Sequence, residues 1–219
     1  MKKLKIITEF PVAYNSPDHI VPVGTKNDNS TDSEYIMEVE NFFKNEKINI
    51  MDIGCAGGQL AVDFYNRGHL SVGIEGSDYN IKHKQFNWPT YHEKVLWTAD
   101  LTKPFKMVDE NNNRVFFDLI SAWEVVEHIH PNDLDNFFDN ILSQLKPDGI
   151  FISSVNMGPD DRIDKNGNVI HLHQSVFQEK HWKEKILSKR IVESYPFVNK
   201  VRNSLNSFYM TMKREKDVK

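Results

Sequence analysis

One glycine-rich segment and one acid beyond it have the residue types and spacing needed to hold a nucleoside-containing cofactor. Residues 48–58 run from an apolar stretch through Asp52 into a turn of small residues, and a helical pattern follows from Gln59. This order of strand, tight turn and helix brings backbone N–H groups up to a polar ligand, and glycine permits an approach that a Cβ would block. A second apolar run, 70–74, ends in Glu75, where a carboxylate can accept hydrogen bonds from ribose hydroxyls.

A histidine with a neighbouring carboxylate is a candidate general base. His128 follows Glu127 a few residues beyond the apolar run 115–122. An imidazole titrates near neutral pH and can take a proton from an acceptor group. A histidine at the start of a helix could instead bond only to the backbone, so the sequence leaves both interpretations open.

Two further histidines lie in the polar segment that follows. His171 and His173 flank one leucine, so in an extended chain their side chains point the same way. They could face an acceptor pocket, or could ligate a metal together with Asp160 or Asp161. Histidines spaced in this way in a loop are commonly solvated, and we therefore expect no metal site.

Alternating apolar runs and helical patterns indicate which elements position these groups. Predicted strands cover residues 48–53, 70–74, 94–97, 115–122, 150–155 and 207–213, and predicted helices cover 33–45, 59–67, a short stretch from 78, 134–145 and 178–187. Asp32 or Ser33 is expected to cap the first helix and Gly68 to end the second. Residues 1–32 are predicted to be an irregular lead-in, 107–114 a surface turn and 156–168 a polar loop.

Polar residues follow four of the predicted strands at their carboxyl ends. They are Asp52, Glu75, Asp100 and Trp123 with Glu124. Strands that alternate with helices imply a parallel sheet with right-handed crossovers, and ligands of such sheets bind beyond the carboxyl ends of the strands. We therefore expect all of these residues at one site.

Composition limits the classes of partner. The 219 residues carry a net charge of −4 and are 39% hydrophobic, as expected for a globular domain without attraction to a polyanion. Basic residues between 180 and 190 are interspersed with acids, which is typical of a solvated helix face. Cys55 is the single cysteine, and no run approaches the roughly 18 apolar residues of a membrane span. We expect a cytoplasmic protein that binds neither nucleic acid nor membrane.

Five segments, in this order, resemble motifs of the class I S-adenosylmethionine-dependent methyltransferases. They are residues 52–58, Glu75, Asp100 with Leu101, residues 117–120 with 124–129, and residues 145–149. The resemblance covers residues 46–156 and is nearest to the branch related to ubiquinone-biosynthesis O-methyltransferases and to methyltransferases of sugar pathways. The departure is Ala56, which stands where the family has its middle glycine; a positive φ there would cost energy.

The resemblance implies S-adenosyl-L-methionine as the cofactor. It places Asp52, Gly54, Cys55, Ala56, Gly57 and Gly58 at the methionine part, Glu75, Gly76 and Ser77 at the ribose, Asp100 and Leu101 at the adenine, and Trp123 and Glu124 beside them. For methylation of a hydroxyl, which must lose its proton, it favours His128 as the general base, with His173 and His171 behind it.

Several of these residues have plainer interpretations. Glu75 could be a surface acid, Asp100 could only cap the turn into Pro104, and Trp123 could belong to the core or shield the adenine or the sulfonium. Cys55 has no evident partner and is not expected to be catalytic.

The resemblance also implies the architecture. It predicts an α/β fold with a Rossmann-like, seven-stranded, mostly parallel sheet, an antiparallel last strand and helices on both faces. Residues 1–46 are expected to form a helical lead-in that caps the cleft of a methyltransferase domain over residues 47–219. The expected reaction is methylation of an oxygen of a small molecule or sugar. The alternatives are a cofactor-binding sensor or subunit without catalysis, and a nicotinamide-dependent oxidoreductase, which the glycine spacing disfavours.

Overall fold

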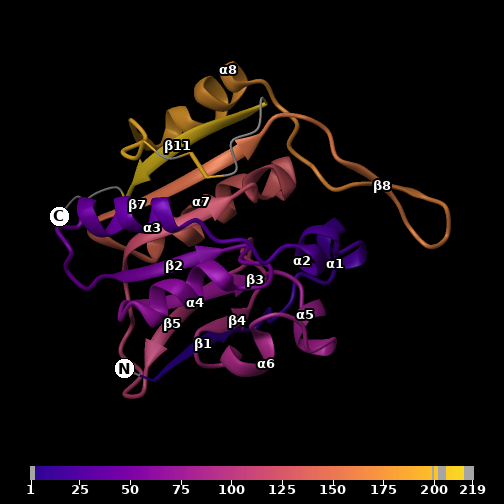
Figure 1. The fold of residues 1–219 in the computed structure, drawn as a ribbon. Helices are drawn as coiled ribbons and strands as arrows, with labels where there is room; N and C mark the ends of the chain where they lie inside the picture. The colour runs from indigo at the N-terminus through magenta and orange to yellow at the C-terminus, as the bar shows by residue number, and fades with distance from the viewer. Residues whose placement is uncertain (1–2, 199, 202–205, 215–219) are drawn as a thin grey trace.

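A seven-stranded sheet forms the centre of the computed structural model, which describes residues 3–198, 200, 201 and 206–214 (Figure 1). In sheet order the strands are β10 (Ile191–Glu193), β11 (Ser207–Lys213), β7 (Leu145–Asn156), β6 (Phe117–Trp123), β2 (Asn49–Ile53), β3 (Leu70–Glu75) and β4 (Leu96–Thr98). Neighbours from β7 to β4 run parallel, whereas β11 is antiparallel to both β7 and β10. The predicted mostly parallel sheet with an antiparallel last strand is therefore confirmed.

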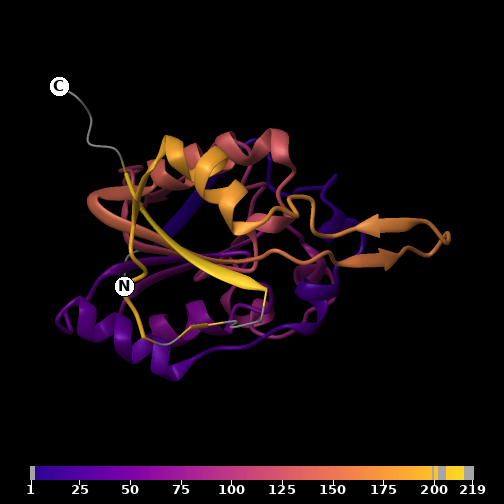
Figure 2. The ribbon, with the colours of Figure 1, turned by 90° about the horizontal axis from the view of Figure 1, so that it is seen from above.

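Helices cover both faces of this sheet, as Figure 2 shows from above. On one face, α3 (Ser33–Phe42) and α4 (Gln59–Asn66) pack against alternate strand residues; this cluster includes Tyr35, Ile36, Val39, Leu60, Phe64, Ile50, Leu119 and Ile152. On the other face lies α7 (Leu134–Ser143), where the cluster includes Phe137, Phe138, Ile141, Met51, Ile120 and Phe151. Because successive strand residues point to opposite faces, a strand covered on both sides has to be apolar throughout.

Local sequence signals set several element ends. The Asp32 side chain accepts a hydrogen bond from the Tyr35 N–H at 2.9 Å and caps α3. Gly68, with φ of 90°, follows the last turn of α4, a conformation that favours glycine. The last strand, β11, has the predicted bounds, whereas β4 begins two residues later than predicted.

The N-terminal lead-in pairs with the segment after β4 in an unpredicted pair of strands. β1 (Leu4–Thr8) pairs antiparallel with β5 (Phe105–Asp109), so the surface turn predicted for 107–114 is wrong over its first part. Phe105 and Met107 are buried whereas Lys106 between them is exposed, which is a strand pattern that the adjacent asparagines obscured. The predicted irregular lead-in also holds two short helices, α1 (Pro17–Ile20) and α2 (Val23–Asn27).

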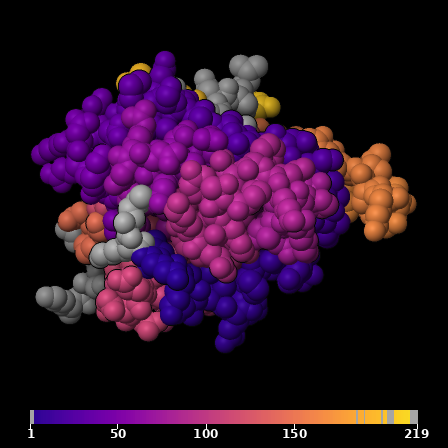
Figure 3. Space-filling view, turned by 60° about the horizontal axis from the view of Figure 1, so that its bottom comes forward, coloured from indigo at the N-terminus to yellow at the C-terminus, as the bar shows by residue number. Residues whose placement is uncertain are grey.

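Two predictions in the C-terminal third are corrected. The predicted polar loop 156–168 forms most of a hairpin, β8 (Asp161–Ile163) with β9 (Val169–His171), which projects from the body (Figures 1 and 3). Its turn closes because the Asp164 carboxylate accepts from the Asn166 and Asn168 N–H groups, both at 2.8 Å. The predicted helix 178–187 is broken into α8 (Glu179–His181), a π turn (Trp182–Ile186) and a 3₁₀ turn (Leu187–Lys189).

Between β3 and β4 the chain makes two short helices, α5 (Tyr79–Lys82) and α6 (Trp88–Tyr91), with Pro89 in the first turn of α6. Proline is tolerated there because the first N–H groups of a helix have no partner within it. None of the helices in the described residues is both long and apolar enough to cross a membrane.

Candidate active site

The carboxyl ends of neighbouring strands bring the predicted acids to one edge of the sheet. Asp52 of β2 lies opposite Ser121 of β6, Glu75 ends β3, and Asp100 follows β4 closely. Four of the predicted cofactor residues line one hollow of about 250 Å³ at this edge: Asp52, Gly54, Cys55 and Trp123. The N-terminal segment supplies Asp28, Ser30, Thr31 and Asp32 to the same wall.

The glycine loop between β2 and α4 is closed by hydrogen bonds within the chain. The N–H groups of Gly54 and Cys55 both donate to Ile74 O. The N–H of Ala56 donates to Glu75 Oε2, that of Gly57 to Asp28 O and that of Gly58 to Cys55 O. The donor–acceptor distances of these bonds are 2.7–3.2 Å. In this closed arrangement these N–H groups therefore donate to protein oxygens, and the assignment of the loop to a cofactor stays a prediction.

Ala56 adopts the costly conformation that the sequence analysis identified. Its φ is 45°, a left-handed value that costs a non-glycine residue about 1–2 kcal/mol. Its carbonyl accepts from Trp88 Nε1 at 2.7 Å and from Asn80 Nδ2 at 3.2 Å, and these bonds hold the residue in place. Gly57 is needed because the Asn29 side chain packs closely against it: a Cβ on Gly57 would lie 2.3 Å from Asn29 Oδ1.

Glu75 is a buried carboxylate, only 6% exposed, so its interpretation as a surface acid is wrong. One oxygen accepts from the Ala56 N–H at 2.8 Å; the other accepts from the Ser77 N–H at 3.2 Å and the Thr25 hydroxyl at 3.3 Å. Burial raises the pKa of Glu75, and these hydrogen bonds oppose the rise.

Asp52 is equally buried at the end of β2. The Ser121 hydroxyl donates to its Oδ1 at 2.8 Å. Burial raises the pKa of Asp52 to about 7; the bond from Ser121 lowers it in part, and the charge of Glu75 adds to the rise. A positive group placed in the adjoining hollow would favour the ionised form of this carboxyl.

The implied adenine position is bonded to the N-terminal segment. Asp100 N–H donates to Phe10 O, and Ala13 N–H donates to Gly76 O, both at 2.9 Å. The Asp100 carboxylate accepts from the N–H and the hydroxyl of Thr102 at 2.9 and 2.7 Å, and so caps its own turn. Asp100 therefore caps this turn, and its assignment to the adenine stays a prediction.

The remaining predicted cofactor residues lie close by. Leu101 and Ser77 are buried. The Trp123 ring packs edge-on against Tyr35, with centroids 5.1 Å apart, while Trp123 also lines the hollow. Glu124 has φ of 55°, and such left-handed non-glycine residues cluster at functional sites.

A carboxylate and two histidines meet just beyond β6. Glu127 is fully buried; its Oε1 accepts from Asn156 N–H at 2.8 Å, and its Oε2 has no hydrogen-bond partner among the described residues. The rings of His128 and His173 meet edge to face, with centroids 4.7 Å apart. Nδ1 of His128 lies 2.9 Å from Oδ2 of Asp18, which comes from α1.

Burial and charge set the protonation of this cluster. Burial raises the pKa of Glu127 to about 7, and the neighbouring His128 lowers it in part. Burial would lower the pKa of His128, but Asp18 and Glu127 outweigh it and raise that pKa to about 9. Burial also lowers the pKa of His173. At neutral pH His128 is therefore a cation beside a carboxyl that readily changes its protonation.

The two histidines of the polar segment are separated. His171 is exposed on β9, with Nδ1 2.7 Å from Asp161 Oδ1, whereas His173 joins His128. The ligand atoms of Glu127, His128 and His173 all lie within 4.8 Å of one another. These three, rather than the His171 and aspartate set considered from the sequence, could hold a divalent cation, although the sequence analysis expected none.

Sequence reasoning missed two members of this cluster as site residues. Glu127 had a signal, since an acid next to a histidine follows a predicted strand, but it was interpreted only as the neighbour of His128 and as part of a motif. Asp18 had none, because its position depends on how the lead-in folds over the sheet.

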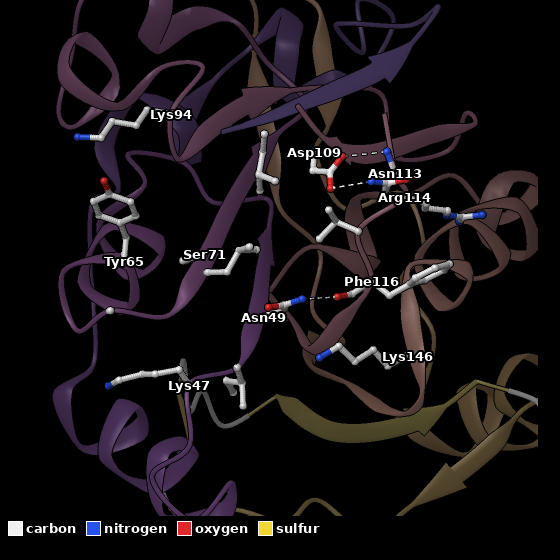
Figure 4. A pocket seen from close by; sticks show the side chains of 15 residues that line it. Lys47, Asn49, Tyr65, Ser71, Lys94, Asp109, Asn113, Arg114, Phe116 and Lys146 are labelled. Atoms are coloured by element: carbon white, nitrogen blue, oxygen red, sulfur yellow. Dashed lines mark hydrogen bonds between the residues drawn. The ribbon is translucent and has the colours of Figure 1, made fainter. Parts of the chain in front are cut away.

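A larger hollow of about 600 Å³ lies at the opposite edge of the sheet, near the starts of β2 and β3 (Figure 4). Its polar lining includes Lys47, Lys94, Arg114 and Lys146. None of the predicted site residues lines it, so we do not place the reaction there.

Comparisons with known proteins agree with this geometry. Residues 30–190 match a family model described as a methyltransferase domain. The mitochondrial ubiquinone biosynthesis O-methyltransferase of Bos taurus is 36% identical over 113 residues, 49% of this chain and 28% of that protein. The ubiquinone biosynthesis O-methyltransferase of Pelagibacter ubique is 33% identical over 112 residues, which are 51% of this chain and 43% of that protein. The chain therefore matches less than half the length of either relative.

One solved structure shows the shared fold. An S-adenosylmethionine-dependent methyltransferase from Clostridium acetobutylicum superposes with a TM-score of 0.59 at 13% identity, over 90% of this chain and 95% of that one. At such low identity the likeness concerns the fold alone.

Proposed function

This chain belongs to the methyltransferase-domain family, in its class I S-adenosylmethionine-dependent branch, and we propose that it methylates an oxygen of a small molecule or sugar. The observation that carries the proposal is a juxtaposition. Trp123, at the end of β6, lines the hollow beside Asp52 and Gly54. Glu127 and His128 lie on the turn that follows β6, and His173, which follows β9, completes their cluster. The names of both relatives, as O-methyltransferases, support oxygen as the acceptor atom.

The proposed donor site uses the residues at the carboxyl edge. Asp52 and loop residues 54–58 would hold the methionine part of S-adenosylmethionine, Glu75 the ribose and Asp100 the adenine. Two buried carboxylates suit a donor that carries a sulfonium and an ammonium group, because a nearby positive charge favours their ionised forms. Trp123, which lines the hollow, would exclude water from the methyl group.

The proposed acceptor site must remove a proton. In the reaction the acceptor oxygen forms a bond to the methyl carbon, while the carbon–sulfur bond breaks and leaves its electron pair on sulfur. His128 is the proposed base, with His173 beside it; because the pKa of His128 is about 9, it accepts a proton only after losing its own. Glu127, with a pKa of about 7, is the neighbouring group that can take that proton. We assign no proton transfer to His171, which is exposed on β9.

The same cluster favours a second mechanism, in which Glu127, His128 and His173 bind a divalent cation. A buried carboxylate oxygen without a partner in the described part of the chain, close to two imidazoles, is a donor set that suits such an ion. A cation there would polarise the acceptor hydroxyl and favour its ionisation. Dialysis against EDTA should then abolish turnover, and added Mg²⁺, Mn²⁺ or Zn²⁺ should restore it. Turnover that survives chelation would favour the base mechanism.

Calorimetry with S-adenosylmethionine and with NAD tests the proposal first. We expect binding of S-adenosylmethionine alone; binding of NAD alone would favour an oxidoreductase. Release of the demethylated donor should then be followed across sugars, phenols and other hydroxyl acceptors. Donor binding without turnover on any acceptor, together with indifference to His128→Ala, would favour a sensor or subunit without catalysis.

A further inference from the structure

The N-terminal segment 10–32, here called the strap, crosses the proposed donor site. Hydrogen bonds join it to the residues of that site. Asp100 N–H donates to Phe10 O, Ala13 N–H to Gly76 O and Gly57 N–H to Asp28 O, each at 2.9 Å. The Thr25 hydroxyl donates to Glu75 Oε1 at 3.3 Å, and Nδ1 of His19 lies 3.1 Å from the Ser77 hydroxyl. Figure 3 shows N-terminal residues lying against the region between β3 and β4, and Figure 1 shows α1 and α2 beside α5. The strap therefore touches each part of the site that would hold a nucleoside.

The closed strap leaves too little room for the whole donor. The hollow measures about 250 Å³, below the roughly 300–1,000 Å³ typical of small-molecule sites. Glu75 and Thr25 are only 6% and 5% exposed, so the carboxylate proposed for the ribose hydroxyls is bonded to the strap and shielded from solvent. A nucleoside can reach Glu75 only after Thr25 has moved.

Specific polar contacts dock the strap. Asn80 Nδ2 donates to Thr25 O at 2.7 Å, and the absent side chain of Gly57 makes room for Asn29 of the strap. Asp18 of the strap contacts His128 at 2.9 Å. By contrast, the large side chains of Tyr14 and Ile20 are 58% and 54% exposed. A segment that buries little apolar surface opens locally at lower cost than the core does.

We propose that the strap is a gate, which opens to admit S-adenosylmethionine and closes again over it. Through Asp18, closure at the donor side also fixes the orientation of His128 at the acceptor side. This inference rests on the proposed function, since it takes the carboxyl edge of the sheet to be the donor site.

A reversible lock tests the gate. An ideal Cβ on Gly76 would lie 3.5 Å from the Cβ of Ala13, within the roughly 3.5–4.5 Å of a disulfide. The Ala13→Cys, Gly76→Cys double variant should therefore cross-link when oxidised. We expect oxidation to weaken S-adenosylmethionine binding more than tenfold by calorimetry, and reductant to restore it. Each single variant, which lacks the bridge, controls for the substitutions, and the buried natural Cys55 is retained.

A second variant needs no cross-link. Thr25→Val removes the hydroxyl that holds the strap to Glu75, so the open form becomes more populated and donor association in stopped-flow fluorescence should accelerate several-fold. Thr211→Val is the matched control, since that buried hydroxyl on β11 has no partner in the described residues. The Thr25→Val measurement decides the matter if the double variant does not fold.

The outcomes separate the two hypotheses. Equal donor binding by the oxidised and reduced double variant, or an unchanged association rate for Thr25→Val, overturns the gate and leaves the proposed function standing. If the unmodified chain does not bind S-adenosylmethionine at all, the proposed function is wrong and the gate is wrong with it.

Discussion

Replacing Asp52 by asparagine should stabilise the protein increasingly as the pH rises. Burial raises the pKa of Asp52 from 3.8 to about 7. In the unfolded chain the value returns to about 3.9, so between these limits the folded state binds more protons than the unfolded state. The contribution of Asp52 to the free energy of unfolding therefore falls between about pH 4 and pH 7 and is level above.

The magnitude follows from the two pKa values. They differ by about three, and each pH unit is worth about 1.4 kcal/mol, which gives a loss of about 4 kcal/mol above pH 7. Between pH 5 and pH 8 the same arithmetic gives roughly 2–3 kcal/mol. Asparagine does not ionise, and its Oδ1 can still accept the bond from Ser121. Any constant cost of the new amide group cancels when the two pH values are compared.

Urea unfolding at pH 5 and pH 8 measures this effect. We expect the difference between Asp52→Asn and the unmodified protein to become more favourable to the variant by roughly 2–3 kcal/mol at the higher pH. Asp148→Asn is the control, because Asp148 is exposed in the first part of β7 and its replacement should change little at either pH. The same shift for both variants, or none for Asp52→Asn, would refute the reasoning from burial.

Three further substitutions test the site and its packing. Glu75→Gln should weaken S-adenosylmethionine binding by roughly 1.5–3 kcal/mol, since a charged hydrogen bond is lost; unchanged affinity by calorimetry would contradict the ribose assignment. His173→Ala should lower turnover at saturating donor, whereas His171→Ala should not, because only the first contacts His128; equal effects would contradict this assignment. Gly57→Ala should lower the melting temperature, since its Cβ would lie 2.3 Å from Asn29 Oδ1, and an unchanged value would show that the strap yields there.

Much of the central sheet could be predicted because its signals are local. Apolar runs marked β2, β3 and β6, and the acids at the carboxyl ends of β2 and β3 marked the edge where Asp52 and Glu75 lie. Asp32 caps the start of α3 and Gly68 follows the end of α4, and both signals depend only on neighbouring residues. The predicted division of the chain at residue 46 stays a prediction.

The missed features depend on distant partners. β1 forms only because Leu4 can pair with Asp109, more than a hundred residues away. The strap shows no apolar periodicity, because individual hydrogen bonds rather than a repeating apolar face join it to Glu75 and Asp100. The cluster at His128 likewise requires the β8–β9 hairpin to return His173 to the end of β6.

A crystal structure of the chain with S-adenosylmethionine tests the central claim most directly. We predict the adenosine at Glu75 and Asp100, the sulfonium beside Trp123 with its methyl group toward His128, and the bond between Thr25 and Glu75 broken. Density for the donor in the hollow at the opposite edge, among Lys47, Lys94 and Lys146, would contradict the account.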